Sequence, residues 1–331
     1  MSFQVKPGDK LERGIISALA FYDMFNYPLT LVEIWRFLQE PAGEIAGESF
    51  SLGEILEAVE RRETLRRKIT KKKGLYMLRG REELYDSRLA RHNQAQFRWR
   101  KARRLISILG GVPFLKMVAL CNMFPIDTPS PDSDIDVVVV AKSGRIWLVR
   151  LIVTFLIALT GQWRHRRVAN KICLSFFLND QHLDLKKLYK DKGIWHEDDP
   201  YLYNWVTLVA PIYNRAKTAS KFWRANDWIT KYQPNAYLYK PVPLRRVQPS
   251  PWALGWQSFW EMVLQGQLGD LVEKTVRWWQ MEYMKTRGDQ EWLKNPNVVR
   301  SDEVLKFHEI DRREHFRDEF KDRLMTAYRN N

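Results

Sequence analysis

One short segment constrains the fold of this chain more than any other: residues 134–140 read Asp-Ile-Asp followed by four valines. An unbroken run of β-branched residues of this length favours a buried strand, and no helical period competes with it. Two further apolar runs, 118–121 and 172–178, also read as strands, and an apolar helix over 146–160 separates the second strand from the third. The middle of the chain is therefore predicted to be a small sheet with a helix between two of its strands.

Three helices and a basic hairpin are predicted before this sheet. Apolar residues recur in the helical period through the first 65 residues. Thr30 with Glu33 and Ser51 with Glu54 match the capping-box pattern and mark the starts of the second and third helices, the third running toward Leu65. Residues 66–78, with a turn at Lys-Lys-Lys-Gly, read as a short hairpin. This order is typical of a winged helix-turn-helix.

The densest positive charge falls on the end of the third helix and on the hairpin. Residues 61–73 contain eight Lys or Arg and one acid, Glu63, in a chain whose formal charge is +15. A winged helix would present this face to nucleic acid, whose phosphates such charges neutralise; the alternative is a solvated helix end. The predicted nucleic-acid contacts are Arg62, Arg66, Arg67, Lys68, Lys71, Lys72 and Lys73.

A long basic helix and a largely helical C-terminal region complete the predicted organisation. The helix, predicted over 88–109, would join the N-terminal module to the sheet, with Phe97, Trp99 and Ile106 packed between them. The predicted fold class is α+β, with a winged-helix domain over 1–86, a small mixed-sheet α/β domain with its linker helix over 87–190, and a helical domain over 191–331.

Nine of the 14 tryptophans lie beyond residue 200. Trp252, Trp256 and Trp260 recur at helical spacing, which is more typical of core packing than of a surface that stacks ligands. In the last predicted helix, over 311–329, apolar side chains recur every fourth residue from Phe316 onward. They predict a stripe that faces the rest of the domain.

The strongest functional pattern is the acidic stretch 132–136 at the start of the valine strand. Because successive side chains of a strand alternate between its faces, Asp134 and Asp136 are predicted to project to one side while Ile135 enters the core. Mg²⁺ takes one or two carboxylates together with substrate phosphates, and metal ions held in this way stabilise an in-line displacement at phosphorus. Taken alone, an Asp-x-Asp at a strand edge is more often a solvated turn, so the surrounding order of elements matters.

That order of strand, polar loop, Asp-x-Asp, valine run and helix resembles the DNA polymerase beta-like nucleotidyltransferase superfamily, and in particular a bacterial subgroup with an N-terminal winged helix. The stretches that carry the resemblance are 25–30, 78–82, 132–136, 171–174 and 226–228. The resemblance implies a magnesium site at Asp134 and Asp136. It also implies that a nucleoside triphosphate is bound near Asn122, Met123, Ser133 and Lys171.

Two departures from this superfamily bear on activity. Its members have a Gly-Ser turn after the first strand, where this chain has Asn122 and Met123, and Met123 supplies neither the backbone freedom of glycine nor a hydroxyl donor. Active members usually add a third acid from a later strand as general base. The strand predicted over 172–178 contains none, and the nearest candidates are Asp180 and Asp184.

These observations leave two hypotheses of different class. The first is an enzyme that transfers a nucleoside monophosphate from a triphosphate to a hydroxyl acceptor with Mg²⁺. The second is a catalytically degenerate nucleotidyltransferase fold that binds nucleic acid or regulates another process. A membrane-surface protein is a third, less favoured reading, because the window 146–160 contains Arg150 and falls short of the ~20 residues that span a bilayer.

Other sites are less favoured. Cys121 and Cys173 lie in apolar segments, where reduced thiols behave as small hydrophobes, and no disulfide framework is expected. The six histidines show no paired spacing of zinc type. The acidic run that follows His196 is better explained by capping of a helix that starts at Pro200. No signal-peptide pattern opens the chain, so a cytoplasmic location is expected.

Overall fold

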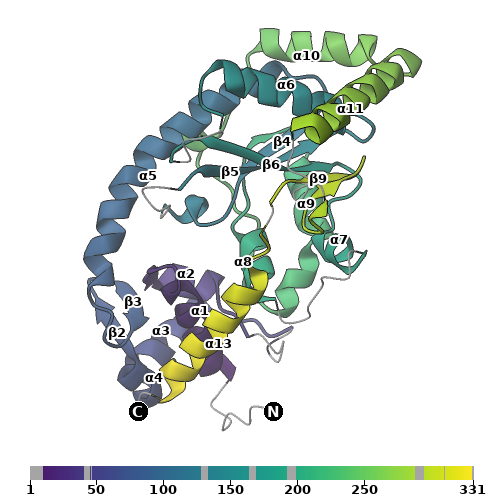
Figure 1. Cartoon of the computed structure of the whole chain (residues 1–331). Coiled ribbons are helices and arrows are strands. Elements are labelled where there is room, and N and C mark those ends of the chain that lie inside the picture. Colours follow the sequence, from purple (N-terminus) through teal and green to yellow (C-terminus); the bar gives the residue numbers. More distant parts are fainter. Residues whose placement is uncertain are drawn as a thin grey trace.

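The computed structural model describes residues 10–40, 45, 47–127, 133–163, 169–191, 199–287, 294–308 and 310–329. Asp132, the basic loop 164–167 and the acidic residues 196–198 lie outside the described residues. The described part is a mixed α and β structure, in which a helical N-terminal module with a small sheet lies below a larger mixed sheet that has helices on both faces (Figure 1).

The N-terminal module follows the predicted order of three helices and a hairpin, and it adds a short strand, β1, and a short helix, α4. It comprises α1 (Lys10–Asp23), β1 (Leu29–Thr30), α2 (Leu31–Arg36), α3 (Leu52–Arg61), α4 (Glu63–Lys68), β2 (Ile69–Lys72) and β3 (Leu75–Leu78). Both predicted capping boxes are confirmed, at Thr30 and Ser51. The prediction that the third helix continues toward Leu65 is wrong, because Arg62 takes an extended conformation and separates α3 from α4.

The basic hairpin is confirmed, with a tighter turn than predicted. Lys71 and Lys72 belong to β2, so only Lys73 and Gly74 form the turn, with φ of 48° and 83°. Two turn residues in the left-handed region match the twist of the strands they join. β1 pairs with the other edge of β3, which makes a three-stranded sheet.

The central and C-terminal regions together build the larger sheet. The central elements are α5 (Leu84–Ser107), η1 (Ile108–Gly111), β4 (Leu115–Leu120), η2 (Phe124–Ile126), β5 (Ile135–Ala141), α6 (Ile146–Leu159) and β6 (Ile172–Asn179). The C-terminal elements are α7 (Leu185–Asp191), α8 (Pro200–Thr207), β7 (Ala210–Asn214), α9 (Thr218–Ala225), η3 (Asp227–Lys231), η4 (Pro243–Arg245), α10 (Pro251–Val263), α11 (Gln267–Arg287), β8 (Val299–Arg300), β9 (Val304–Lys306) and α13 (Arg313–Arg329).

The strands lie in the order β7-β4-β5-β6-β9-β8. β5 and β6 are parallel and the other neighbours are antiparallel. The prediction that the chain is helical throughout after residue 199 is therefore wrong at β7, β8 and β9. These short strands extend the sheet on either side of the predicted strands. The sheet therefore contains strands from before residue 190 and strands from after it. Their strand conformation comes from pairing with a distant strand, and local propensity over two to five residues gives little sign of it.

The valine run is explained by burial on both faces of the sheet. Val137 and Val139 pack on one face with α5 and α6, and Val138 and Val140 pack on the other with α7, α8 and α9. A strand covered on both sides has no solvated face and so shows no polar alternation. The predicted strand is confirmed with its interior fully buried.

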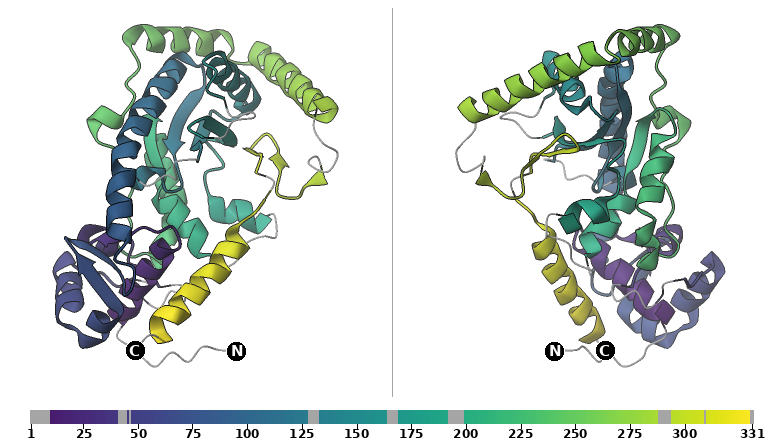
Figure 2. Two further views of the ribbon diagram at one scale, coloured as in Figure 1. Left: turned by 60° about the vertical axis from the view of Figure 1, so that its left-hand side comes forward. Right: turned by 90° about the vertical axis from the view of Figure 1, so that its right-hand side faces the viewer.

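The last described helix, α13, packs on the N-terminal module, which lies at the other end of the sequence. Figure 2 shows α13 lying beside the N-terminal helices, while α5 spans the distance from that module to the larger sheet. Phe320 is 2% exposed and meets Phe21 of α1 edge to face, with ring centroids 5.8 Å apart. Arg323 forms an ion pair with Asp23 at 2.6 Å. The predicted apolar stripe is therefore confirmed as a packing surface, but the prediction that it faces the rest of the C-terminal domain is wrong, because the stripe packs on the N-terminal core.

The prediction that the tryptophans of α10 pack in a core is wrong. Trp252 and Trp256 are 89% and 58% exposed, so the tryptophan stripe of α10 is not core. This helix docks instead through Gln257, which is fully buried and donates to the Val112 carbonyl. Helical spacing shows that side chains share a face, but it does not show which face is buried.

The linker helix gives a mixed outcome. Trp99 is 2% exposed and packs edge to face on Phe124, and Ile106 is also buried. Both side chains belong to the core of the larger sheet and not to the N-terminal core, so they are buried but do not pack between the two modules as predicted. Phe97 is 65% exposed, so its predicted interdomain packing is wrong. Among the described helices, none has the length and apolar character that crossing a membrane requires.

Candidate active site

A cavity of about 1060 Å³ lies where the larger sheet faces the N-terminal module and the segment before α13. Its lining comes from the segment after β4, the start of β5, the start of β6, helix α8 and residues 306–308, 310–313 and 316, and it includes both Asp134 and Asp136. The predicted carboxylate pair therefore lies at a cavity large enough for a nucleotide-sized ligand.

The two acids owe their position to the start of β5. Asp134 directly precedes the strand, and Asp136 is its second residue. Between them Ile135 is fully buried in the opposite core, as predicted from strand alternation. Both acids are only partly exposed, so their charges act in surroundings less polar than bulk water.

Asn122, in the turn that follows the neighbouring strand β4, holds Asp136. Its side-chain amide donates to Asp136 Oδ2 at 2.5 Å, and the Tyr201 hydroxyl donates to Asn122 Oδ1 at 3.4 Å. Asn122 has φ of 57°, in the left-handed region that glycine adopts freely and asparagine tolerates. The turn that resembles the superfamily's Gly-Ser therefore keeps a glycine-like backbone at its first position.

Of the other residues predicted to bind nucleotide, two line the cavity and one does not. Met123 and Ser133 line the cavity, and Ser133 Oγ accepts a hydrogen bond from the Arg98 guanidinium at 3.1 Å. Met123 also packs against the N-terminal core. Lys171 is not among the lining residues: its ammonium donates to the Gly161 carbonyl, at the end of α6.

The candidates for a third acid lie far from the pair. β6 runs parallel to β5, and the residue of β6 opposite Asp136 is Cys173. Asp180 comes seven residues later, roughly 20 Å along the strand direction, where it accepts a hydrogen bond from Ser143 N. Asp184 accepts from Lys187 N and caps α7. In the described part of the chain, the position that a third acid would take on β6 is occupied by a thiol.

Cys173 belongs to a cluster of possible metal ligands that the sequence pattern did not indicate. One ligand atom each of Asp136, Cys173 and His308 lies within 4.8 Å of the other two. Ser175 lies in the same group, with its Oγ 3.1 Å from Cys173 Sγ and 3.0 Å from His308 Nε2. His308 follows β9, so only pairing of β9 with β6 brings it here.

A second thiol, Cys121, lies at the end of β4 beside this cluster. Burial raises its pKa well above the ordinary value, and the neighbouring carboxylate of Asp136 adds to the shift. Burial likewise raises the pKa of the Tyr201 hydroxyl. Both groups therefore remain protonated at neutral pH.

Two basic side chains, Lys306 and Arg313, also line the cavity. Lys306 and Arg313 stand against the ring of Tyr189, at 5.5 Å and 4.1 Å from its centroid. Burial lowers the pKa of Lys306, and within the described residues no carboxylate lies within ion-pair distance of its ammonium. This side chain therefore has charge available for an anionic ligand.

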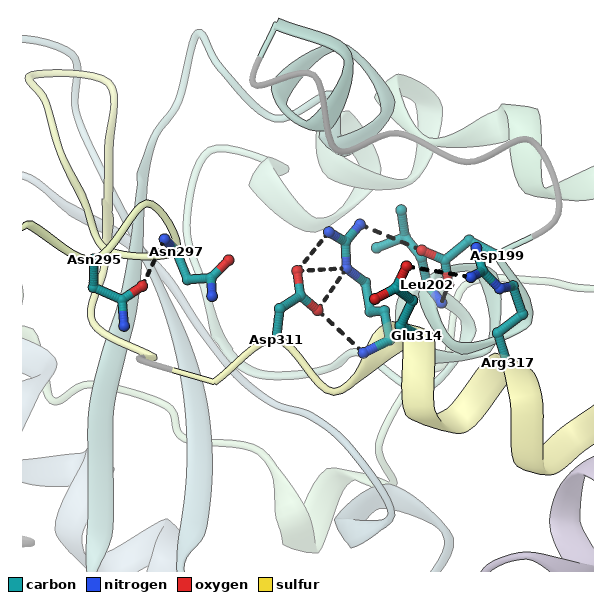
Figure 3. A network of polar contacts seen from close by, with 8 residues as sticks. Asp199, Leu202, Asn295, Asn297, Asp311, Glu314 and Arg317 are labelled. Atoms are coloured by element: carbon teal, nitrogen blue, oxygen red, sulfur yellow. Dashed lines mark hydrogen bonds and ion pairs between the residues drawn. The ribbon is translucent and has the colours of Figure 1, made fainter.

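Arg313 is held by a buried ion network. Its guanidinium donates to both oxygens of Asp311, at 2.9 Å and 2.6 Å, and lies 3.3 Å from Asp199. Figure 3 shows Asp311 and Asp199 on opposite sides of this guanidinium. Although burial opposes the effect, the hydrogen bonds from Arg313 lower the pKa of Asp311. Asp199 also caps α8 by accepting from Leu202 N, as predicted, so the network links α8 to the segment before α13.

Four of the predicted nucleic-acid residues, Arg62, Arg67, Lys71 and Lys72, form ion pairs. Lys71 meets Glu60 at 2.5 Å, and Arg67 meets Glu63 at 2.5 Å. Lys68 donates to the carbonyls of Ala327 and Tyr328 at the end of α13. Arg62 lies 3.5 Å from Glu12 and Lys72 lies 3.4 Å from Asp86, which are longer contacts. Lys73 and Arg66 are exposed. Exposed pairs contribute only ~0–1 kcal/mol, so phosphates can replace most of these partners.

Comparison with known proteins does not assign the chain to a family. No protein-family model matches it, and neither a search of curated proteins nor one of solved structures finds a match. The case for function therefore depends on the cavity and its side chains.

Proposed function

We propose that the chain is a nucleotidyltransferase of the DNA polymerase beta-like superfamily that binds a nucleoside triphosphate in the cavity. The observation that carries the proposal is that Asp134, Asp136, Lys306 and Arg313 all line one large cavity. A metal-bound triphosphate needs carboxylates for its cation and positively charged side chains for its phosphates, and this cavity offers both.

The oxygen ligands of this site fit a magnesium ion. Mg²⁺ takes one or two carboxylates from protein and completes its shell with water and phosphate oxygens, and Asp134 and Asp136 supply such carboxylates. A bound Mg²⁺ would neutralise charge on the phosphates and polarise the phosphorus under attack. Asn122, supported by Tyr201, orients Asp136 by donating to one of its oxygens.

Lys306 is the side chain of this chain that we assign to the triphosphate. Its ammonium is shielded from bulk water, and a charged hydrogen bond in such surroundings contributes about 1.5–3 kcal/mol. Arg313 is less available, because Asp311 and Asp199 already accept its hydrogen bonds.

Lys306→Met is therefore expected to weaken binding of a nucleoside triphosphate with Mg²⁺ by at least about 10-fold. Isothermal titration calorimetry measures this affinity, and filter capture of radiolabel measures transfer to a cellular RNA pool. Lys142→Met is the matched control, since Lys142 is exposed and directly follows the last residue of β5, at the end of the strand away from Asp136. Absence of triphosphate binding by the native chain, or equal binding by Lys306→Met, would contradict the proposal.

The N-terminal module is proposed to recruit the acceptor as a winged helix that binds nucleic acid. Replacing Arg66, Arg67, Lys71 and Lys72 by Gln is expected to weaken retention of RNA or DNA. The slope of log affinity against log salt should fall by about 3, because each lost phosphate contact removes ~0.7–0.9 from it. Electrophoretic mobility shift over a salt series measures both quantities.

The control for this prediction removes the same charge elsewhere: Gln at the exposed Lys187, Lys190, Lys221 and Arg224. This control should bind nucleic acid as the native chain does. If it lost as much affinity as the first variant, binding would depend on overall charge and the winged-helix interface would be wrong.

A catalytically degenerate fold is the second candidate, and two observations favour it. Among the described residues no third acid forms a group with Asp134 and Asp136 in which the carboxylate oxygens lie within 4.8 Å of one another. Met123 supplies no hydroxyl for phosphate. Tight binding of a triphosphate or of nucleic acid without label transfer to any acceptor supports this candidate over the enzyme.

A further inference from the structure

The cluster of Asp136, Cys173 and His308 has the composition of a transition-metal site. Its three ligand atoms lie within 4.8 Å of one another. Atoms bound to one tetrahedral Zn²⁺ at ~2.0–2.3 Å lie roughly 3.3–3.8 Å apart, so small side-chain rotations bring these three onto a common ion. We propose that Asp136, Cys173 and His308 bind a zinc-class divalent cation at the edge of the cavity.

The ligand types select zinc over magnesium. Mg²⁺ requires hard oxygen ligands in octahedral geometry, whereas thiolate and imidazole bind Zn²⁺ well. One thiolate, one carboxylate and a neutral imidazole also balance the two charges of the ion, so the complex carries no net charge. A neutral complex costs less to place in a partly buried position than a charged one.

The backbone holds two of these ligands firmly. Asp136 and Cys173 are paired residues of the adjacent parallel strands β5 and β6. His308 follows β9, which is antiparallel to β6, and Phe307 N donates to the Ser175 carbonyl at 2.8 Å immediately before it. Ligands on paired strands are positioned more precisely than ligands on loops.

Ser175 gives a further sign that these groups face one another. Its hydroxyl is within hydrogen-bond distance of both Cys173 Sγ and His308 Nε2. Asp136, Cys173, Ser175 and His308 all line the cavity. Three protein ligands with a fourth position open to a cavity is the arrangement of catalytic zinc sites, in which water or substrate occupies that position.

This inference does not rest on nucleotidyl transfer, although Asp136 belongs to both sites. Its test is direct metal binding by the chain after removal of metals with a chelator. We expect one Zn²⁺ per chain, measured by competition with a chromophoric chelator. Co²⁺ in its place should give the intense visible bands of tetrahedral coordination and a thiolate-to-cobalt charge-transfer band.

Cys173→Ser and His308→Ala are each expected to weaken Zn²⁺ binding by at least about 100-fold, since loss of even an outer-shell partner commonly costs 10–100-fold. Cys173→Ser should also abolish the thiolate band. Cys121→Ser is the matched control: it removes the other buried thiol, which lies outside the cluster, and should keep both affinity and spectrum. Circular dichroism of each variant establishes that it is folded, and His308→Ala provides the test if Cys173→Ser does not fold.

Failure to bind one Zn²⁺ would overturn the inference, as would unchanged affinity in His308→Ala or an equal loss in Cys121→Ser. Triphosphate binding in Mg²⁺ alone, with no zinc bound, would overturn the zinc site and leave the proposed function standing. If the chain bound zinc through Cys173 and His308 but bound no triphosphate, the zinc site would stand and the proposed function would be overturned.

Discussion

Asp136→Asn is expected to lower label transfer from a nucleoside triphosphate by about 1000-fold or more. The substitution keeps the shape of the side chain and an oxygen that can accept from Asn122, but it removes the charge that a cation needs. Loss of several kcal/mol of charge stabilisation in the transition state corresponds to this factor, since each ~1.4 kcal/mol is tenfold. The initial rate of label incorporation, measured at saturating triphosphate and Mg²⁺, checks the expectation. Asp134→Asn should act in the same direction.

The matched control is Asp180→Asn. Asp180 is also an acid at the end of a strand, but it lies at the far end of β6 and its oxygen accepts from Ser143 N, a bond that the amide oxygen of Asn can replace. Its activity should equal that of the native chain. Transfer that survives at Asp136→Asn, or that falls equally at Asp180→Asn, would remove the carboxylate pair from the mechanism.

Phe320→Ala is expected to lower the free energy of unfolding by about 3–5 kcal/mol. The ring is 2% exposed, belongs to the N-terminal core and contacts Phe21 edge to face, so its removal leaves a cavity between α13 and α1. Urea denaturation followed by circular dichroism measures the change. Because α13 is the last described helix, the result also tests whether the end of the chain completes the N-terminal module.

Phe259→Ala provides the comparison for this prediction. Phe259 is an aromatic residue of α10 that is 50% exposed, and its loss should cost less than about 1 kcal/mol. A cost at Phe320 no greater than that at Phe259 would mean that α13 does not pack on α1 in solution.

Local features of the chain were predictable because their physical causes are local. The valine strand, the capping boxes at Thr30 and Ser51 and the cap at Asp199 all depend on residues a few positions apart. The shared direction of Asp134 and Asp136 follows from strand alternation in the same way. Both acids line the cavity.

Predictions failed where burial depends on what an element meets. Trp252 and Phe97 lie on helices as expected, yet both are exposed, because the helix spacing of apolar residues does not identify the packing partner. In α10 the buried residue is Gln257, which bonds to a backbone carbonyl of another segment. No pattern within the helix indicates that bond.

The amino-acid order alone specifies which short segments become strand or helix and where two acids emerge from a sheet, since those outcomes depend on neighbours within a few residues. Assembly of the site requires the folded chain. His308 reaches Cys173 and Asp136 only because β9 pairs with β6, and α13 meets α1 only after the chain has passed through the whole sheet. Contacts between residues more than a hundred positions apart leave no periodic signal along a chain, because they arise from packing and strand pairing in three dimensions.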